Sequence, residues 1–233
     1  MRLAEIRQRL GGLGNPRDAE FAGRYFKTGP GQYGAGDRFR GIRVPVLRAL
    51  CRECGEPPLP EILELLKSPH HEDRLLALLI LVRLFGRGDE KTRARIFSRY
   101  LKHTRYINNW DLVDTSAPHI VGAFLMDKDR APLYRLVRSK SLWERRISVM
   151  ATQYFIKGGD FRDTLKIARL LIADPEDLIH KAVGWMLREV GNRDRKAEEG
   201  FLRDWSGKMP RVMLRYAIEK FPPERRRFFL QGV

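Results

Sequence analysis

The sequence predicts an all-α protein built from successive pairs of helices. Across its 233 residues no segment sustains the alternation of apolar and polar residues that a half-buried strand requires. From residue 59 onward the chain instead repeats one pattern, in which an amphipathic segment, a short polar break and a more apolar segment follow one another. The repeat length of roughly 30 to 40 residues is typical of helix-pair repeats.

The stretch before residue 59 predicts N-terminal helices and a glycine-rich loop, residues 1–58. We expect one helix to end near Phe26 and another to begin after Pro45. Between them, residues 29–34 match the spacing Gly-x-Gly-x-x-Gly, but no strand precedes them and no βαβ unit follows, so a dinucleotide site is disfavoured. The glycines predict a flexible connection.

The helix-pair repeats are predicted over residues 59–222, and a basic C-terminal tail, 223–233, completes a single domain. Glycines and prolines stand between the segments, where helices stop. The predicted first helices span 59–67, 91–103, 131–139, 162–173 and 195–205. The predicted second helices begin near Glu72, Trp110, Trp143, Ile179 and Pro210.

Helix pairs that cannot bury their own apolar faces stack on their neighbours, which predicts a curved α-solenoid with one concave surface. The second helices commonly line the concave side of such a stack, and their basic residues would make it a concave basic groove that suits a duplex backbone. Trp110 and Trp185 would lie in the same groove. The basic residues concerned are Arg74, Arg146, Lys181, Arg188, Arg211 and Arg215.

The charge balance indicates a polyanionic partner, with nucleic acid as the leading candidate. Lys and Arg number 45 against 29 Asp and Glu, a formal net charge of +16. Membrane binding is disfavoured, because no apolar run approaches the roughly 18 residues of a spanning helix and the basic residues are spread along the chain. The charged N-terminal residues lack the apolar core of a secretory signal, so we expect an intracellular protein.

The two cysteines, Cys51 and Cys54, fit a reducing compartment. A zinc site would have to recruit His70 and His71, but adjacent histidines lack the usual ligand spacing and no second cysteine pair exists. We therefore expect no metal and no cofactor. The motifs of serine hydrolases, nucleotide-driven enzymes and metallohydrolases are also missing.

Candidate chemistry centres on one stretch near the middle of the chain. If Asn109 caps a helix, Trp110 and Asp114 fall four residues apart on one helix face. Pro118 cannot donate to the carbonyl of Asp114, so the helix should bend or break there. We interpret Asp114 as a catalytic carboxylate beside an aromatic wall. The alternative is that Asn109 only begins a helix, Trp110 is core and Pro118 begins the next helix.

A second candidate is Trp185, which follows Gly184 and precedes Arg188 by one turn. The missing side chain of Gly184 allows a close neighbour, and the guanidinium of Arg188 would lie beside the indole. This arrangement predicts either simple packing or a wall for a cationic or sugar ligand.

Five blocks of the sequence carry a resemblance to a known family. They are Tyr-Phe-Lys at 25–27, Gly-Ile-Arg-Val-Pro at 41–45, Asn-Trp-Asp-Leu-Val-Asp at 109–114, Trp-Glu-Arg-Arg at 143–146 and Lys-Ala-Val-Gly-Trp-Met-Leu-Arg at 181–188. Together they resemble the DNA alkylation repair family of bacterial alkylpurine DNA glycosylases, which are built from HEAT-like repeats. The resemblance covers nearly the whole chain, from about Tyr25 to Phe221, and its specific parts are Trp-x-x-x-Asp and Gly-Trp-x-Leu-Arg.

The resemblance implies hydrolysis of the N-glycosidic bond of cationic N3- and N7-alkylated purines in duplex DNA, without the usual base flipping. It implies that Asp114 is catalytic and that Trp110 and Trp185 flank the lesioned nucleotide. Arg146 and Tyr25 would help to hold the DNA backbone. From their place in the predicted groove, we expect the same of two further basic residues, Lys181 and Arg188.

We expect a monomer that works in the bacterial cytoplasm at the nucleoid. The glycine-rich loop, residues 28–40, is long, so contacts near the lesion would differ from those of other members. The alternative function is a non-catalytic helical-repeat protein that binds damaged or branched DNA, because some relatives keep the scaffold with altered catalytic residues. A protein-binding scaffold is a further alternative. Retention of Asp114, both tryptophans and Arg146 favours the enzyme.

Overall fold

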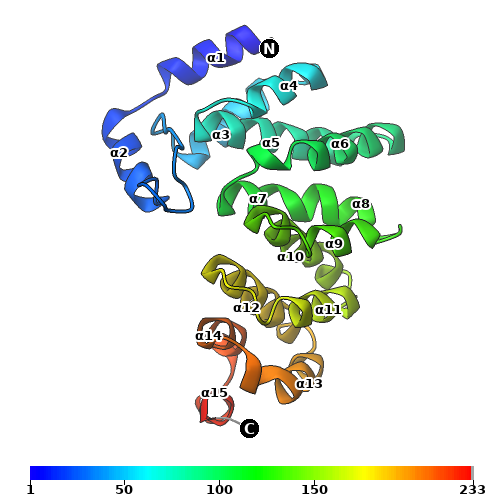
Figure 1. Ribbon diagram of the computed structural model, residues 1–233. Coiled ribbons are helices and arrows are strands. Elements are labelled where there is room, and N and C mark those ends of the chain that lie inside the picture. The colour runs from blue at the N-terminus through cyan, green and yellow to red at the C-terminus, as the bar shows by residue number, and fades with distance from the viewer. Residues whose placement is uncertain (232–233) are drawn as a thin grey trace. The chain divides into compact units, whose positions relative to one another are not determined.

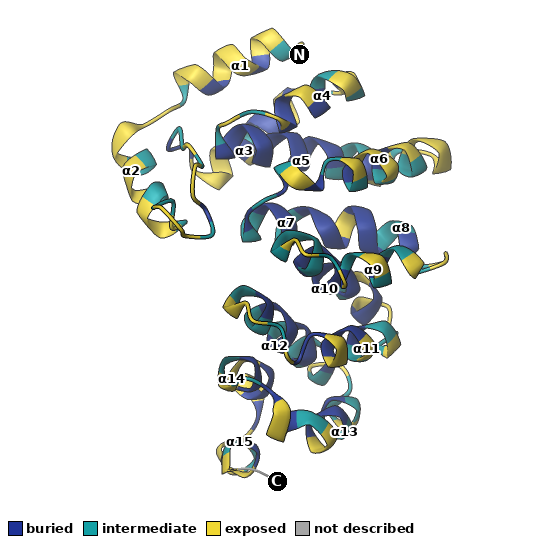
Figure 2. Cartoon of the chain, viewed as in Figure 1, coloured by how far each residue is buried: buried dark blue, intermediate teal, exposed yellow. Residues whose placement is uncertain are grey.

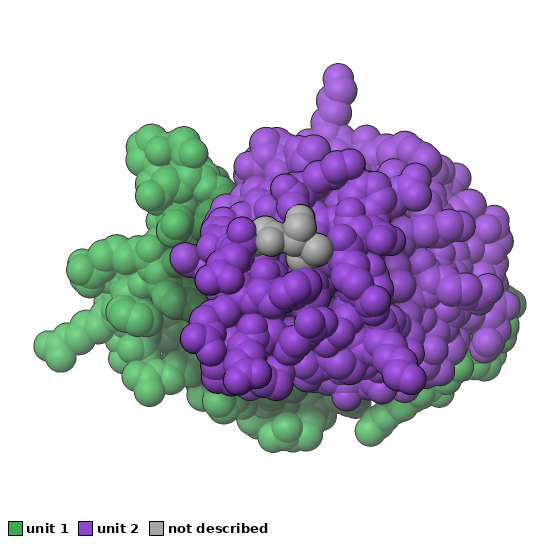
Figure 3. Space-filling model, turned by 90° about the horizontal axis from the view of Figure 1, so that it is seen from below, with its two compact units in different colours: residues 1–116 green, residues 117–233 purple. Residues whose placement is uncertain are grey.

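A computed structural model describes residues 1–231, and every regular element among them is a helix (Figure 1). The predicted all-α class is therefore confirmed over the described chain. The backbone contacts divide the protein into two compact units, residues 1–116 and 117–233, which Figure 3 colours separately. Each unit is described by itself.

Unit 1 is organised around a buried helix, α5. Residues 71–81 of this helix are all buried, and α3, α4 and α6 pack against it (Figure 2). Its apolar run explains this position, since a helix that is hydrophobic on nearly all sides must be covered on all sides. The helices here are α1 (Leu3–Gly12), α2 (Pro16–Tyr25), α3 (Val44–Glu53), α4 (Leu59–Leu66), α5 (His71–Arg87), α6 (Glu90–Lys102), the 3-10 turn η1 (Thr104–Tyr106) and α7 (Trp110–Ala117).

Unit 2 contains the later helix pairs. α10 packs against α12 and α12 against α14, while α9, α11 and α13 pack on the neighbouring members of that row (Figure 1). The elements are the π-turn η2 (Pro118–Gly122), α8 (Ala123–Leu125), α9 (Ala131–Leu136), α10 (Leu142–Lys157), α11 (Arg162–Leu170), α12 (Asp177–Gly191), α13 (Arg195–Trp205), η3 (Ser206–Lys208), α14 (Arg211–Ala217), η4 (Ile218–Lys220) and α15 (Pro223–Gln231).

Helices occupy the segments that the sequence predicts as the first and second helices of pairs. The first helices of the pairs are α4, α6, α9, α11 and α13, and the second helices are α5, α7, α10, α12 and α14. Most of the region predicted as a basic tail forms α15, whose Phe229 is buried. The rest of that prediction, residues 232–233, lies outside the described residues.

The same side-chain contact recurs in three of the second helices. In α5, α10 and α12 the fourth helical residue is basic and donates a hydrogen bond to the carbonyl six residues earlier, in the turn before the helix. We call these three hydrogen bonds the turn bonds. They join Arg74 to Ser68 at 3.1 Å, Arg145 to Ser139 at 3.1 Å and His180 to Asp174 at 2.5 Å. This recurrence supports the interpretation of the helix pairs as repeats.

Gly184 marks a close approach of two helices in unit 2. A Cβ atom placed on it would lie 2.4 Å from the carbonyl oxygen of Met213 and 2.6 Å from Cβ of Tyr216, both in α14. The sequence-based inference that Gly184 admits a close neighbour is therefore confirmed.

The glycine-rich loop is fastened to the start of α5. The carboxylate of Glu72 accepts hydrogen bonds from the backbone amides of Arg40, Gly41 and Ile42, at 2.9, 2.7 and 3.2 Å. Arg40 also forms a bidentate ion pair with Asp73, at 2.6 and 3.0 Å. The C-terminal end of the loop is therefore held by acidic residues 30 or more positions away in the sequence.

The predicted bend or break at Pro118 takes the form of a π-turn. Helical backbone continues through Ala117, with φ −60° and ψ −43°, into η2. Because proline has no N–H to donate four residues back, a wider turn replaces the α-helical one.

Candidate active site

The start of α7 places two of the predicted site residues. The N–H of Trp110 donates to the side-chain oxygen of Asn109 at 2.8 Å, and Asn109 is fully buried. The predicted capping role of Asn109 is thus confirmed. Trp110 and Asp114 follow four residues apart on this helix, and both are half-buried. An indole and a carboxylate therefore share one face of α7.

An aromatic cluster surrounds Trp110 in unit 1. Its ring stacks on Phe26 with centroids 5.5 Å apart and an interplanar angle of 24°, and it meets Tyr25 edge-on at 6.2 Å. Tyr25, at the end of α2, also stacks on Phe21 and is 57% exposed. Tyr25 and Trp110, more than 80 residues apart in the sequence, are therefore brought together on the surface of this unit.

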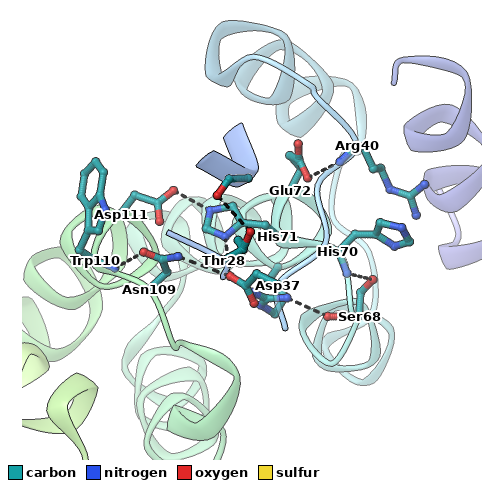
Figure 4. Close-up of polar contacts among 12 residues, drawn as sticks. Thr28, Asp37, Arg40, Ser68, His70, His71, Glu72, Asn109, Trp110 and Asp111 are labelled. Carbon is teal, nitrogen blue, oxygen red and sulfur yellow. Dashed lines mark hydrogen bonds and ion pairs between the residues drawn. The ribbon is translucent and has the colours of Figure 1, made fainter. Parts of the chain in front are cut away.

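A buried polar network lies behind the aromatic cluster (Figure 4). His71 Nε2 lies 2.8 Å from Asp111 Oδ2, and His71 Nδ1 lies 3.3 Å from Asp37 Oδ2. Burial lowers the pKa of His71, but the hydrogen bonds to Asp111 and Asp37 outweigh it, so the pKa rises from 6.5 to about 9. The ring therefore carries a positive charge at neutral pH.

Asp37 holds the other side of this network together. Burial raises its pKa, but the hydrogen bond from His71 and the charge of Arg74 outweigh this effect and leave the pKa below its ordinary value. Arg74 donates to Asp37 at 2.7 Å, and the side-chain amide of Asn109 donates to it at 3.4 Å. The carboxylate of Asp37 in the glycine-rich loop thus connects α5 to Asn109, the residue that caps α7.

A largely apolar cavity of about 450 Å³ opens beside the network in unit 1. Phe21, Phe26, Phe39, Ile42 and Leu75 supply much of its wall, and Asp111 also lines it. One carboxylate oxygen of Asp111, Oδ1, is buried without a hydrogen-bond partner in the described chain.

In unit 2, α12 carries three of the predicted site residues at successive turns. Lys181 forms an ion pair with Asp177 at 2.6 Å, and the indole N–H of Trp185 donates to Glu189 at 3.3 Å. The guanidinium of Arg188 forms an ion pair with the carboxylate of Glu219 in η4.

Arg146, the fourth predicted residue in unit 2, lies in α10 and is only 5% exposed. Its Nη1 donates to the carbonyl of Leu178 in the first turn of α12. Arg146 is therefore packed between α10 and α12, with little of its side chain open to solvent. The burial follows from the close packing of α10 on α12.

The sequence analysis missed His71 and Asp37 as parts of the site. In the sequence His71 stands out only as a poorly spaced zinc ligand, and Asp37 only as one residue of the glycine-rich loop.

Burial raises the pKa of both cysteine thiols, that of Cys54 to about 11, so neither is a reactive thiolate at neutral pH.

Two absences within residues 1–231 concern membranes and metal ions. No helix in this range has the length and apolar character needed to cross a membrane. No group of three or more His, Cys, Asp and Glu side chains in the range is arranged to hold a metal ion.

Comparisons with known proteins identify the family. No curated protein sequence matches the chain. Among solved structures, one described as a predicted DNA alkylation repair enzyme from Enterococcus faecalis is similar, with a TM-score of 0.70 and 17% sequence identity. The similarity covers 91% of this chain and 98% of that one, and at this identity it shows a shared fold. The family model for DNA alkylation repair enzymes matches residues 6–221. The chain belongs to the DNA alkylation repair enzyme family.

Proposed function

We propose that this protein is a monofunctional DNA glycosylase that hydrolyses the N-glycosidic bond of cationic N3- and N7-alkylated purines in duplex DNA. The observation that supports this most directly is the pairing of Asp114 with Trp110 on one face of α7, next to exposed Tyr25. Membership of a DNA alkylation repair family agrees with this substrate class. The proposal requires no metal and no cofactor.

The chemistry needs little more than a carboxylate and aromatic faces. Alkylation at N3 or N7 makes the purine a cationic leaving group, so the barrier lies in stabilising the positive charge that passes to the sugar. The carboxylate of Asp114 would stabilise that charge and position the attacking water. The indole of Trp110 would add cation–π attraction, worth about 0.5–2 kcal/mol.

We assign the residues of unit 2 to DNA binding. Arg146, Lys181 and Arg188 would hold phosphates, and Trp185 would contact the lesioned nucleotide. The formal net charge of +16 supports a grip on several phosphates. The proposal includes stacking of the helix pairs into a HEAT-like solenoid with a concave basic groove, and action by a monomer at the bacterial nucleoid.

The test is release of free 7-methylguanine and 3-methyladenine from methylated duplex DNA in the presence of a chelator. Wild type should release both bases or one of them. Asp114→Asn should abolish release and leave duplex affinity nearly unchanged. Asp204→Asn, the same change at an exposed position of α13, is the matched control and should keep wild-type release.

Other outcomes would favour the alternatives. Unchanged release by Asp114→Asn would refute the assigned catalytic role. Duplex binding without release by wild type would favour a non-catalytic protein that binds damaged or branched DNA. Duplex affinity that does not fall steeply with salt would favour a protein-binding scaffold, because a grip on several phosphates releases counterions.

A further inference from the structure

His71, the first residue of α5, lies where three segments of unit 1 meet. The glycine-rich loop contributes Asp37 and the start of α7 contributes Asp111 (Figure 4). Phe39 of the loop and Arg74 of α5 complete the surroundings of the ring. The backbone N–H of His71 also donates to the carbonyl of Arg38 at 2.8 Å. Contacts from both its backbone and its ring therefore fix this residue.

Both ring nitrogens of His71 face carboxylates. Carboxylates at neutral pH only accept hydrogen bonds, so the nitrogens facing Asp37 and Asp111 must both donate. A ring that donates from both nitrogens is an imidazolium. The geometry alone therefore assigns a positive charge to His71.

The charges around His71 balance within a buried cluster. Arg74 donates to Asp37 at 2.7 Å, so two cations face two carboxylates. The side chains of His71, Arg74 and Asp37 are 2%, 4% and 5% exposed, and that of Asp111 is 16% exposed. Loss of the charge on His71 would leave a buried carboxylate without its counterion, which is strongly unfavourable.

Two routes lead from His71 to Trp110. The polar route passes through Asp37 to the amide of Asn109, whose oxygen accepts the N–H of Trp110. The aromatic route passes through Phe26, whose ring lies 4.8 Å from that of His71 and 5.5 Å from the indole. Both routes end in the first turn of α7, where Asp111 also binds His71 directly.

We propose that His71 acts as a positively charged positioning residue, which fixes the first turn of α7 and thereby orients the indole of Trp110 and the carboxylate of Asp114 one turn later. The inference rests on the proposed function for its effect on catalysis. The effect of His71 on Trp110 can be measured in the free protein, without an activity assay.

The primary variant is His71→Gln, with His70→Gln as the matched control. Figure 4 shows the ring of His70 pointing away from that of His71, and the pKa of His70 is lowered by burial and by the charge of Arg40. His71→Gln should shift the indole N–H resonance of Trp110 in NMR spectra of the free protein. It should also slow single-turnover base release by about 10- to 100-fold, the range expected for a small misplacement of catalytic groups. His70→Gln should do neither.

A pH profile separates positioning from a purely structural role. The charged groups that face His71 are Asp37, Asp111 and Arg74. The rate of base release by the wild-type protein should stay constant up to about pH 8 and fall near pH 9, where His71 loses its proton. The rate of enzyme-independent release is subtracted at each pH. His71→Gln should show no such fall.

Asp111→Asn provides a second test if His71→Gln folds poorly. This variant keeps the shape of the side chain but removes the carboxylate that most raises the pKa of His71. The alkaline fall in release should then move to lower pH, a shift that a packing role would not produce.

The outcomes distinguish the two proposals. A shifted Trp110 resonance with no base release by wild type would support the positioning role and refute the glycosylase function. An unshifted Trp110 resonance in His71→Gln, or an unmoved alkaline fall in Asp111→Asn, would refute the positioning role whatever the activity.

Discussion

The guanidinium of Arg146 in α10 donates a hydrogen bond to the carbonyl of Leu178 at the start of α12. Because Arg146 is 95% buried, its replacement by Ala should remove this hydrogen bond and open a gap between the helices. We expect a loss of about 2–3 kcal/mol in the free energy of unfolding. Thermal melting should show this loss as a Tm lower by about 5–10 °C.

Lys181→Ala is the control for Arg146→Ala. Lys181 is a more exposed cation whose ion pair with Asp177 is worth about 0.5 kcal/mol, so its Tm should change little. The duplex affinities of the two variants are then compared at a temperature well below both Tm values, where both proteins are folded. Equal Tm values for the two variants would contradict the structural role of Arg146.

Glu198 in α13 is a buried carboxyl whose Oε1 has no hydrogen-bond partner in the described chain. Burial raises its pKa from 4.5 to about 8, against the opposing charge of Arg195. The folded protein therefore holds this proton more tightly than the unfolded chain. Its favourable contribution is complete below about pH 4.5 and is lost as the pH rises through about 8.

Glu198→Gln should therefore stabilise the protein at pH 8 by roughly 1–3 kcal/mol, because an amide does not ionise and no buried charge has to form. Melting curves from pH 4.5 to 8.5 should show a gain that grows with pH. The same change at exposed Glu176 is the control and should give no such gain. A pH-independent difference for Glu198→Gln would show that its carboxyl is already ionised in the fold.

Gly184 and Gly200 make a matched pair of helical glycines. Gly184→Ala should be destabilising by about 1–3 kcal/mol, because its Cβ would collide with the backbone of α14. At Gly200 in α13 no atom beyond the neighbouring residues and the backbone of the helix itself lies within 4 Å of an added Cβ. Gly200→Ala should therefore be neutral or stabilising by up to about 1 kcal/mol. Denaturant unfolding of both variants checks the difference, and equal effects would contradict the close approach at Gly184.

The individual helices could be predicted from the sequence because their signal is local. Apolar residues recur at helical spacing within each segment, and prolines and glycines mark the ends, so α11 and α13 begin at the predicted residues, Arg162 and Arg195. The pairing of Trp110 with Asp114 follows from the same helical period. The π-turn at Pro118 was predicted only as an irregularity, because the sequence shows a missing donor but not how the backbone adapts.

The network around His71 could not be predicted because its partners come from distant parts of the chain. Asp37 lies 34 residues before His71 and Asp111 lies 40 residues after it. The adjacent pair His70 and His71 looked equivalent in sequence. Only the folded structure distinguishes them. The ring of His71 lies beside two carboxylates, and the ring of His70 points away from it (Figure 4). Burial of Arg146 escaped prediction for the same reason.

The turn bonds bear on how the chain reaches its folded state. Each connects a helix to the turn immediately before it, so it closes a loop of only six residues. Closing so short a loop costs little chain entropy and is fast, on the order of 10–100 ns. Arg145 can therefore fix the direction of α10 relative to the turn before it, before helices distant in the sequence have made contact. Folding can then begin within any helix pair that carries a turn bond and spread to its neighbours.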